Sequence, residues 1–297
     1  MRRRLVLGAA LVLGLAVLLK LGWSGFGAPQ SSVASSPPPF LQAAFSPSPP
    51  PSTTAPLPTS AVALDLPAVP ERYRGQIIRQ RVRRFPKKLL ALTFDDGPSP
   101  NLTPQVLRIL RENQAHATFF VLGKCVKRWP GLVKQAAEEG HAIGSHSYRH
   151  PSSTSPTQAA EELTSTAQLI EQATGHRPVL FRPPYGITVG NLCRTALAEK
   201  YTAVLWTISS ADSNPIAAAV IARNIIHTPN PGDIVLMHDG ATHVETVKAL
   251  PQVLRELGAA GFEFVTLPRL LQEWDLWLKQ EKSQAQVNSP RENAARR

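Results

Sequence analysis

Two adjacent carboxylates, Asp95 and Asp96, stand where a short apolar run ends. The run 89–94 has the length and composition of a buried strand, and Gly97-Pro98 breaks it sharply. Neighbouring carboxylates repel each other when both are ionised, so the pair is unfavourable unless their roles are divided. A division in which one carboxylate binds a metal ion and the other handles protons would be chemically useful. The plain alternative is a polar strand end followed by a turn.

A second candidate group lies downstream in Ser145–Pro151, which places His146 and His150 four positions apart. On a helical turn such a pair would share one face, so both imidazoles could reach one ion. Two histidines and one carboxylate leave positions open on a zinc-like ion for water and substrate. A histidine pair at this spacing is often incidental, and it is the upstream Asp95-Asp96 strand end that favours a metal site.

The elements that must position these residues alternate between short apolar runs and helical patterns. Strands are expected at 89–94, 117–122, 142–144, 179–181, 203–208, 234–237 and 263–266. Helices are expected at 103–112, 130–139, 156–173, 191–199, 216–226 and 245–257. This alternation predicts a mainly parallel α/β domain, which can close into a barrel with its site at the carboxyl ends of the strands.

Chemically active side chains follow five of the expected strands. In chain order they are Asp95 with Asp96, His146, Arg182, Asp212 and His238. Strand ends that point to one face predict a single site there. Taken alone, Arg182 could form a surface ion pair and His238 could be a satisfied core histidine, but their shared face favours a role in chemistry.

Four motifs, in this order, resemble those of the polysaccharide deacetylase (NodB-homology) family, also called carbohydrate esterase family four. They are Thr93-Phe-Asp-Asp-Gly97, His146-Ser-Tyr-Arg-His150, Arg182-Pro-Pro-Tyr-Gly186 and Leu236-Met-His-Asp-Gly240. The resemblance covers about residues 88–275. It implies an α/β fold, a distorted, partly open (β/α) barrel of about seven parallel strands. It also implies metal-dependent hydrolytic removal of acetyl groups from a polysaccharide, most often from N-acetylglucosamine.

The resemblance further implies a role for each matching residue. Asp95 would be the general base, Arg182 would hold it in place, and His238 would be the general acid. The backbone N–H of Tyr185 would help to bind the oxyanion. Three residues match the metal ligands of the family: Asp96, His146 and His150. One divalent ion is therefore expected, with zinc the best fit and cobalt, manganese or nickel left open.

The stretch Trp206–Pro215 departs from the family pattern. The family usually has an acidic stretch ending in Asp-Trp, where the Asp orients the catalytic histidine and the Trp lines the acetate pocket. Asp212 matches that Asp and is expected to pair with His238. Ser213 replaces the Trp, and Ser209 stands where an earlier acidic residue is common. These changes leave the wall of the acetyl pocket, and with it the substrate, open.

The formal net charge of +11 comes from the two ends of the chain. Residues 1–88 hold 12 Lys and Arg against 2 Asp and Glu, whereas residues 89–275 hold 15 against 17. The basic excess lies outside the expected domain, so the sequence does not predict a nucleic-acid-binding protein. Cys125 and Cys193 form no metal or redox motif. They are expected as free core residues, and a disulfide between them stays open.

The expected organisation begins with an export segment. Residues 1–28 have a charged start and an apolar run, as in a signal peptide or an N-terminal membrane anchor, and residues 5–22 could serve as a tether. Residues 29–87 are expected as a Pro/Ser-rich and then basic linker, 88–275 as the deacetylase domain and 276–297 as a polar basic tail. We expect an exported monomer, secreted or membrane-anchored, that acts on peptidoglycan or a chitin-like oligosaccharide. The alternative is a non-catalytic carbohydrate-binding or wall-attachment protein.

Overall fold

The computed structural model of the protein describes residues 68–294, with side chains up to residue 286. The export segment expected at 1–28 and the Pro/Ser-rich stretch up to residue 67 lie outside the described residues. Within residues 68–294, no helix is both long enough and apolar enough to cross a lipid bilayer.

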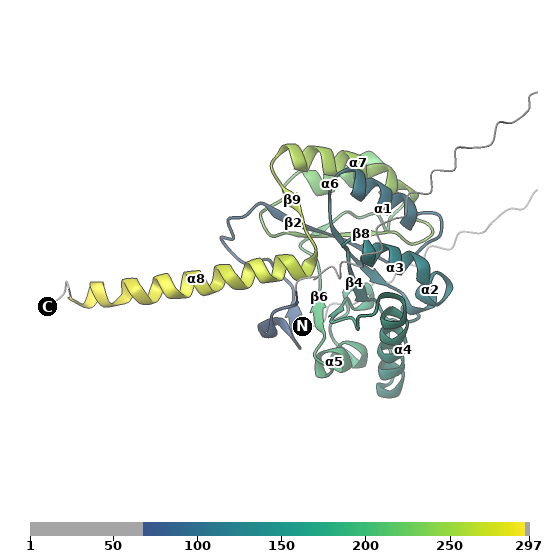
Figure 1. Ribbon diagram of the computed structural model, residues 1–297, viewed down its shortest axis with the longest axis horizontal. Coiled ribbons are helices and arrows are strands. Elements are labelled where there is room, and N and C mark those ends of the chain that lie inside the picture. The colour runs from purple at the N-terminus through teal and green to yellow at the C-terminus, as the bar shows by residue number, and fades with distance from the viewer. Residues whose placement is uncertain (1–67, 295–297) are drawn as a thin grey trace, which may run out of the picture. The chain divides into compact units, whose positions relative to one another are not determined.

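A parallel sheet of nine strands forms the centre of the described chain (Figure 1). The strands are β1 (Ile77–Ile78), β2 (Leu89–Asp95), β3 (Ala117–Val121), β4 (Ala142–Ser145), β5 (Leu180–Phe181), β6 (Thr202–Val204), β7 (Ile208–Ser209), β8 (Ile234–His238) and β9 (Glu263–Phe264). Their spatial order is β1-β6-β5-β4-β3-β2-β8-β7, and β9 pairs with the start of β2. The recorded pairings are all parallel, as the alternation of strands and helices predicts.

The sheet is a partly open barrel whose two edges are linked by one short crossing. β6 pairs with β1 and β5 near one edge, whereas β7 pairs with β8 at the opposite edge. The crossing between them is Leu205–Thr207, and backbone hydrogen bonds tie it to Ile78 on one side and Ile234 on the other. The single strand expected at 203–208 is therefore two strands, because the chain changes neighbours within it.

Helices follow most of the strands along the described chain. They are α1 (Thr103–Glu112), α2 (Gly123–Arg128), α3 (Pro130–Glu138), α4 (Pro156–Thr174), α5 (Asn191–Ala198), α6 (Ala218–Ile226), α7 (Val244–Ala259) and α8 (Leu267–Ala294). Six of them are expected from the sequence, whereas α2 and α8 are not. α4 begins with a capping box between Ser155 and Gln158 and ends at Gly175, which adopts the left-handed conformation. Figure 1 shows α6 and α7 on one side of the strands, and α4 and α5 on the other.

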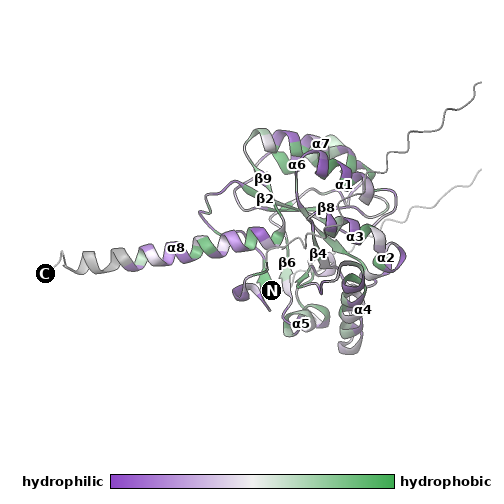
Figure 2. Ribbon diagram, viewed as in Figure 1, coloured by the Kyte–Doolittle hydropathy of each residue, from purple (hydrophilic) through white to green (hydrophobic). Residues whose placement is uncertain are grey.

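Alternation along β2 separates the two faces of the sheet. Leu90 and Phe94 belong to a core cluster with apolar residues of α1, α6 and α7. Leu89 and Ala91 belong to a second cluster, inside the barrel, with residues of α8. The central strands are mostly hydrophobic in Figure 2, whereas the helices also carry hydrophilic stretches. Because side chains alternate, Asp95 lies on the inner face, at the carboxyl end of its strand.

α8 closes the end of the barrel opposite the carboxyl ends of the strands. The N–H of Leu267 donates to the hydroxyl of Thr118 near the start of β3, and Trp274 is buried in the inner cluster. The approach is close, since a Cβ atom added at Gly232 would lie 2.8 Å from the Trp274 indole nitrogen. The segment expected as a polar tail from residue 276 is thus helical through residue 294.

The segment 68–88 is part of the fold, although the sequence suggests the basic end of a linker. Glu71–Tyr73 form a short 3-10 turn, and β1 pairs with β6. Arg72 forms an ion pair with Asp275 at 2.9 Å. Three apolar side chains of this segment are buried: Val69, Tyr73 and Phe85. Residues 69–88, which the sequence assigns mostly to the linker, therefore pack as part of the described fold.

Candidate metal and catalytic site

Three potential metal ligands converge at the carboxyl ends of β2 and β4. The Nε2 atoms of His146 and His150 each lie 3.7 Å from Oδ1 of Asp96. One ligand atom from each of the three residues lies within 4.8 Å of the other two. Asp96 reaches this position because its backbone turns into the left-handed region, with φ of 72°, directly after β2 ends.

The donor set fits a single divalent cation. Oδ1 of Asp96 is buried without a hydrogen-bond partner in the part of the chain that the structure describes, which is unfavourable unless a cation compensates it. Nδ1 of His146 lies 2.7 Å from the carbonyl oxygen of Arg182. That nitrogen therefore donates its proton, and Nε2 presents a lone pair. Burial lowers the pKa of His146 to about 3 and also lowers the pKa of His150, so both rings are neutral donors.

The two histidines meet through a loop rather than a helical turn, which corrects the expected geometry. β4 ends at Ser145, and no helix covers the histidine motif. Ser147 and His150 both adopt left-handed backbone conformations, with φ of 67° and 68°. The loop folds back so that the ring centres of His146 and His150 lie 4.9 Å apart.

Arg182 occupies the interior of the barrel beside Asp95. Its Nη1 donates to Oδ1 of Asp95 at 2.9 Å and to the hydroxyl of Thr93 at 2.6 Å. Its Nε donates to the carbonyl of Val204 at 3.0 Å, and Nη2 donates to that of Leu205 at 3.3 Å. The arginine side chain is 0% exposed, which rules out a surface ion pair.

One carboxylate oxygen of Asp95, Oδ1, is bound by Arg182, and the other points toward the candidate metal ligands. Its Oδ2 lies 3.7 Å from Nε2 of His146. Burial raises the pKa of Asp95, and the guanidinium of Arg182 opposes that rise. The ring of Phe120 covers the guanidinium, with its centre 4.3 Å from the guanidinium carbon. A carboxylate anchored in this way is placed to accept a proton from a molecule bound beside it.

Asp212 and His238 form a second hydrogen-bonded pair. Oδ1 of Asp212 lies 2.7 Å from Nδ1 of His238, and Oδ2 accepts the backbone N–H of His238 at 2.8 Å and the hydroxyl of Thr246 at 2.7 Å. Burial disfavours the charged imidazole, but the hydrogen bond to Asp212 and the nearby carboxylates outweigh it and raise the pKa of His238 to about 9. The ring is therefore protonated at neutral pH and can donate a proton from Nε2.

Aromatic side chains form part of the wall of the site. Tyr185 adopts a left-handed conformation with φ of 56°, and the residue is 64% exposed. Its ring meets that of His150 edge-on, with the centres 4.4 Å apart. Trp206 lies against Gly186, the residue after Tyr185. A Cβ atom added at Gly186 would lie 3.0 Å from the indole of Trp206. Ser213, which stands where the resemblance leads us to expect Trp, is exposed.

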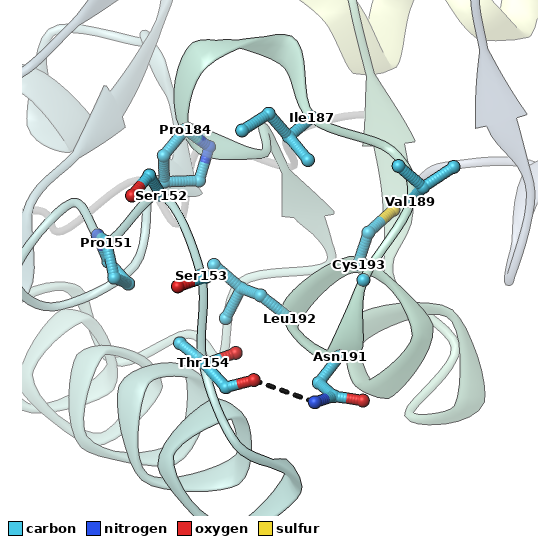
Figure 3. A pocket seen from close by; sticks show the side chains of 11 residues that line it. Pro151, Ser152, Ser153, Thr154, Pro184, Ile187, Val189, Asn191, Leu192 and Cys193 are labelled. Carbon is cyan, nitrogen blue, oxygen red and sulfur yellow. Dashed lines mark hydrogen bonds between the residues drawn. The ribbon is translucent and has the colours of Figure 1, made fainter.

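A hollow of about 140 Å³ has a lining that begins at Pro151, the residue directly after His150 (Figure 3). It lies between the loop Pro151–Thr154, which follows the histidine motif, and the segment Pro184–Cys193. A hydrogen bond from the Asn191 amide to the Thr154 carbonyl, 2.7 Å long, joins its two walls. Cys193 also lines it, and both Cys193 and Cys125 are free thiols, as the sequence suggests.

A second hollow borders the Asp212–His238 pair. Asp212, Thr246 and His243 line it, and the ring of His243 stacks on that of His238 with the centres 4.8 Å apart. A hollow beside the proposed acid suits a ligand that extends beyond one reacting group.

Sequence reasoning missed several residues that hold these groups in place. Thr93 could have been found, because alternation along β2 puts it on the same face as Asp95. Thr246 lies on α7, far along the chain from Asp212, and no local pattern distinguishes it from other polar helix residues.

Known proteins are similar to this chain in both sequence and fold. Residues 82–204 match the family model described as polysaccharide deacetylase. A peptidoglycan-N-acetylglucosamine deacetylase of Bacillus cereus is 39% identical over 191 residues, which cover 62% of this chain and 89% of that protein. A chitooligosaccharide deacetylase of Bradyrhizobium is 33% identical over 194 residues, or 60% of this chain and 89% of that protein. A solved peptidoglycan N-acetylglucosamine deacetylase superposes with a TM-score of 0.63 at 30% identity, covering 68% of this chain and 94% of that structure.

Proposed function

Because this chain belongs to the polysaccharide deacetylase family, we propose that it removes acetyl groups from N-acetylglucosamine residues of peptidoglycan. The observation that carries the proposal is the convergence of three groups at one end of the barrel. They are the ligand set Asp96, His146 and His150, the pair Asp95–Arg182 and the pair Asp212–His238. Each group supplies one of the functions that amide hydrolysis needs.

The residues divide the hydrolysis of an acetamido group between them. A divalent cation held by the ligand set would polarise the acetyl carbonyl and activate a water molecule. Asp95 accepts a proton from the attacking water as the new carbon–oxygen bond forms. His238 gives its Nε2 proton to the leaving nitrogen as the carbon–nitrogen bond breaks, which yields acetate and a free amine. Arg182 and Asp212 orient the base and the acid respectively.

The backbone N–H of Tyr185 is the proposed donor to the oxyanion. Its left-handed conformation and the contact between its ring and His150 support this assignment. A backbone donor next to the ligand set would stabilise negative charge where it develops in the transition state.

Zinc is the proposed metal ion. Two imidazoles and one carboxylate are a common catalytic zinc site, with positions left for water and substrate. Cobalt, manganese or nickel can occupy the same donors, so metal analysis of the purified protein distinguishes them.

Peptidoglycan is the proposed polymer, on the strength of the Bacillus cereus relative and the extended site. Tyr185, Ile187 and Val189 expose 64%, 37% and 80% of their surfaces along one side, where they offer apolar area to a sugar chain. The Bradyrhizobium relative supports chitin-like oligosaccharides as the alternative substrate. A non-catalytic wall-binding role is less favoured, because the acid and the base both keep their partners.

We further propose that the protein is exported and acts as a monomer outside the cytoplasmic membrane. The positively charged start and the apolar run of residues 5–22 support export and a membrane tether. Peptidoglycan as the substrate requires the same location.

Acetate release tests the proposed function. Peptidoglycan and N-acetylated chitooligosaccharides are incubated with the protein as purified, after chelation, and after zinc is restored. We expect release from peptidoglycan that the chelator abolishes and zinc recovers, and release that is slower by about 10²–10⁴-fold from the Asp95→Asn variant. Release from chitooligosaccharides alone would transfer the proposal to that polymer. No release from either, at full metal occupancy, would refute the enzymatic function.

A further inference from the structure

We infer that Glu162 is a positioning residue for the metal site: its buried carboxylate holds the loop that carries His146 and His150. The inference rests on the proposed function only in that Asp96 and the two histidines bind a cation. Glu162 lies on α4 and is only 2% exposed. Its hydrogen bonds go to Tyr148 and Arg149, which lie between the two histidines. A buried carboxylate is unfavourable unless its oxygens are satisfied.

The partners of Glu162 are the residues between the two histidines. Its Oε2 accepts the backbone N–H groups of Tyr148 and Arg149, each at 2.7 Å. Its Oε1 lies 2.8 Å from Nε of Arg149. One side chain of α4 therefore accepts hydrogen bonds from two consecutive N–H groups in the middle of the histidine loop.

These hydrogen bonds matter to the loop because two of its residues have an unfavourable backbone conformation. Ser147 and His150 have φ of 67° and 68°, a region that residues other than glycine seldom adopt. From the other side, α2 donates the N–H of Gly123 to the carbonyl of Ser147 and that of Lys124 to the carbonyl of Tyr148. The loop is thus clamped between donors on α2 and the acceptor on α4.

Removing the acceptor would act on the metal ligands through the backbone. The N–H groups of Tyr148 and Arg149 would lose their buried partner, and the loop would gain the freedom to relax towards commoner φ values. His150 would then leave its position 3.7 Å from Asp96, whereas His146 would stay fixed by its bond to Arg182. Metal affinity should fall through loss of one preorganised ligand.

Metal affinity of purified variants tests the inference. The variants are Glu162→Ala, Glu162→Gln, Arg149→Gln and, as a matched control on the exposed neighbour in α4, Glu161→Ala. Each is titrated with zinc against a chromogenic chelator, loaded with cobalt for its visible spectrum, and melted without metal. Glu162→Ala should raise the zinc dissociation constant about 10–100-fold and change the cobalt spectrum.

The conservative variants distinguish the hydrogen bonds to the loop backbone from the ion pair with Arg149. The amide oxygen in Glu162→Gln can still accept both N–H groups, so the dissociation constant should stay within about threefold of wild type. Arg149→Gln removes only the ion pair, whose arginine is largely exposed, and should behave in the same way. Glu161→Ala should change nothing.

An unchanged zinc affinity and cobalt spectrum in Glu162→Ala, with only a lower melting temperature, would overturn the inference and leave a purely structural role. If that variant does not fold, Glu162→Asp serves instead, because it keeps the charge but withdraws the oxygens from the loop. Its dissociation constant should rise at least about fivefold, and an unchanged value would equally overturn the inference. A protein that binds zinc as expected but releases no acetate would refute the proposed function and leave this inference standing.

Discussion

The carboxylate of Asp95 and the guanidinium of Arg182 lie 2.9 Å apart inside the barrel, with side chains that are 4% and 0% exposed. Asp96, the next residue, turns away through its left-handed backbone and faces two histidines. One carboxylate is thereby compensated by a guanidinium, and the other is presented to a cation. This separation relieves the repulsion that adjacent carboxylates would otherwise experience.

The Arg182–Asp95 contact predicts the behaviour of Arg182→Lys. A single ammonium cannot replace the four hydrogen bonds to Thr93, Asp95 and the carbonyls of β6 and its crossing, so Asp95 should lose its orientation. We expect kcat to fall by about 100-fold with zinc affinity unchanged. Weaker compensation should raise the pKa of Asp95 further and move the acidic limb of kcat/KM to higher pH. Arg177→Lys, at an exposed ion pair, is the control, and full activity with an unmoved acidic limb would contradict the prediction.

Substitution of the adjacent carboxylates should separate turnover from metal binding. Asp95→Asn keeps the shape of the side chain but removes the base, so kcat should fall by about 10²–10⁴-fold while zinc affinity is retained. Asp96→Asn replaces a ligand oxygen that accepts no hydrogen bond from the described residues, so zinc affinity itself should fall. Chelator competition and kcat measured at saturating zinc distinguish the two. Equal loss of zinc in both variants would mean that the roles are wrongly divided.

The sequence predicts those parts of the site that follow from strand periodicity and strand ends. Alternation along β2 puts Thr93 and Asp95 on one face, and parallel strands bring Arg182, Asp212 and His238 to the same end of the barrel. These features depend only on local pattern and on the rule that parallel strands share a direction.

Features that depend on distant contacts could not be predicted. The left-handed conformations of Ser147 and His150 are imposed by α2 and α4, so the spacing of the histidines suggested a helical turn instead. β1 is only two residues long and has basic neighbours in the sequence, so its segment resembled a linker. It forms a strand because it pairs with β6. No turn residue separates β6 from β7, so the change of neighbours at the crossing left no signal.

Tyr185→Gly tests whether the backbone or the side chain of this residue contributes to turnover. Glycine accepts a φ of 56° without strain and keeps the N–H, so kcat should stay within about threefold of wild type. Loss of the exposed ring should raise KM by about threefold to tenfold, because the ring offers a stacking surface to the sugar. Tyr185→Phe keeps the ring and should leave KM near the wild-type value. A kcat lowered 100-fold in Tyr185→Gly would instead assign chemistry to the side chain.

Asp212→Asn should shift the alkaline limb of activity. Burial opposes the charge of His238, and the hydrogen bond to Asp212 is the main influence that raises its pKa to about 9. The acid must be protonated, so wild-type kcat/KM should fall as pH rises through that value. An amide interacts less with an imidazolium, so the limb should move down by about 1–2 pH units, as expected for a lost hydrogen bond to a charged group. Thr246→Val, which removes a neutral partner of the same carboxylate, should shift the limb much less.

The same pair predicts how stability depends on pH in the metal-free protein. The pKa of His238 rises from 6.5 to about 9 on folding, so its contribution to the free energy of unfolding is fully present below pH 6.5. That contribution, about 3 kcal/mol, is lost as pH rises through 9. Urea denaturation at pH 6 and pH 10 should show this loss in wild type and a smaller one in Asp212→Asn. Equal losses in the two proteins would show that Asp212 does not hold the proton on His238, and the acid would need another partner.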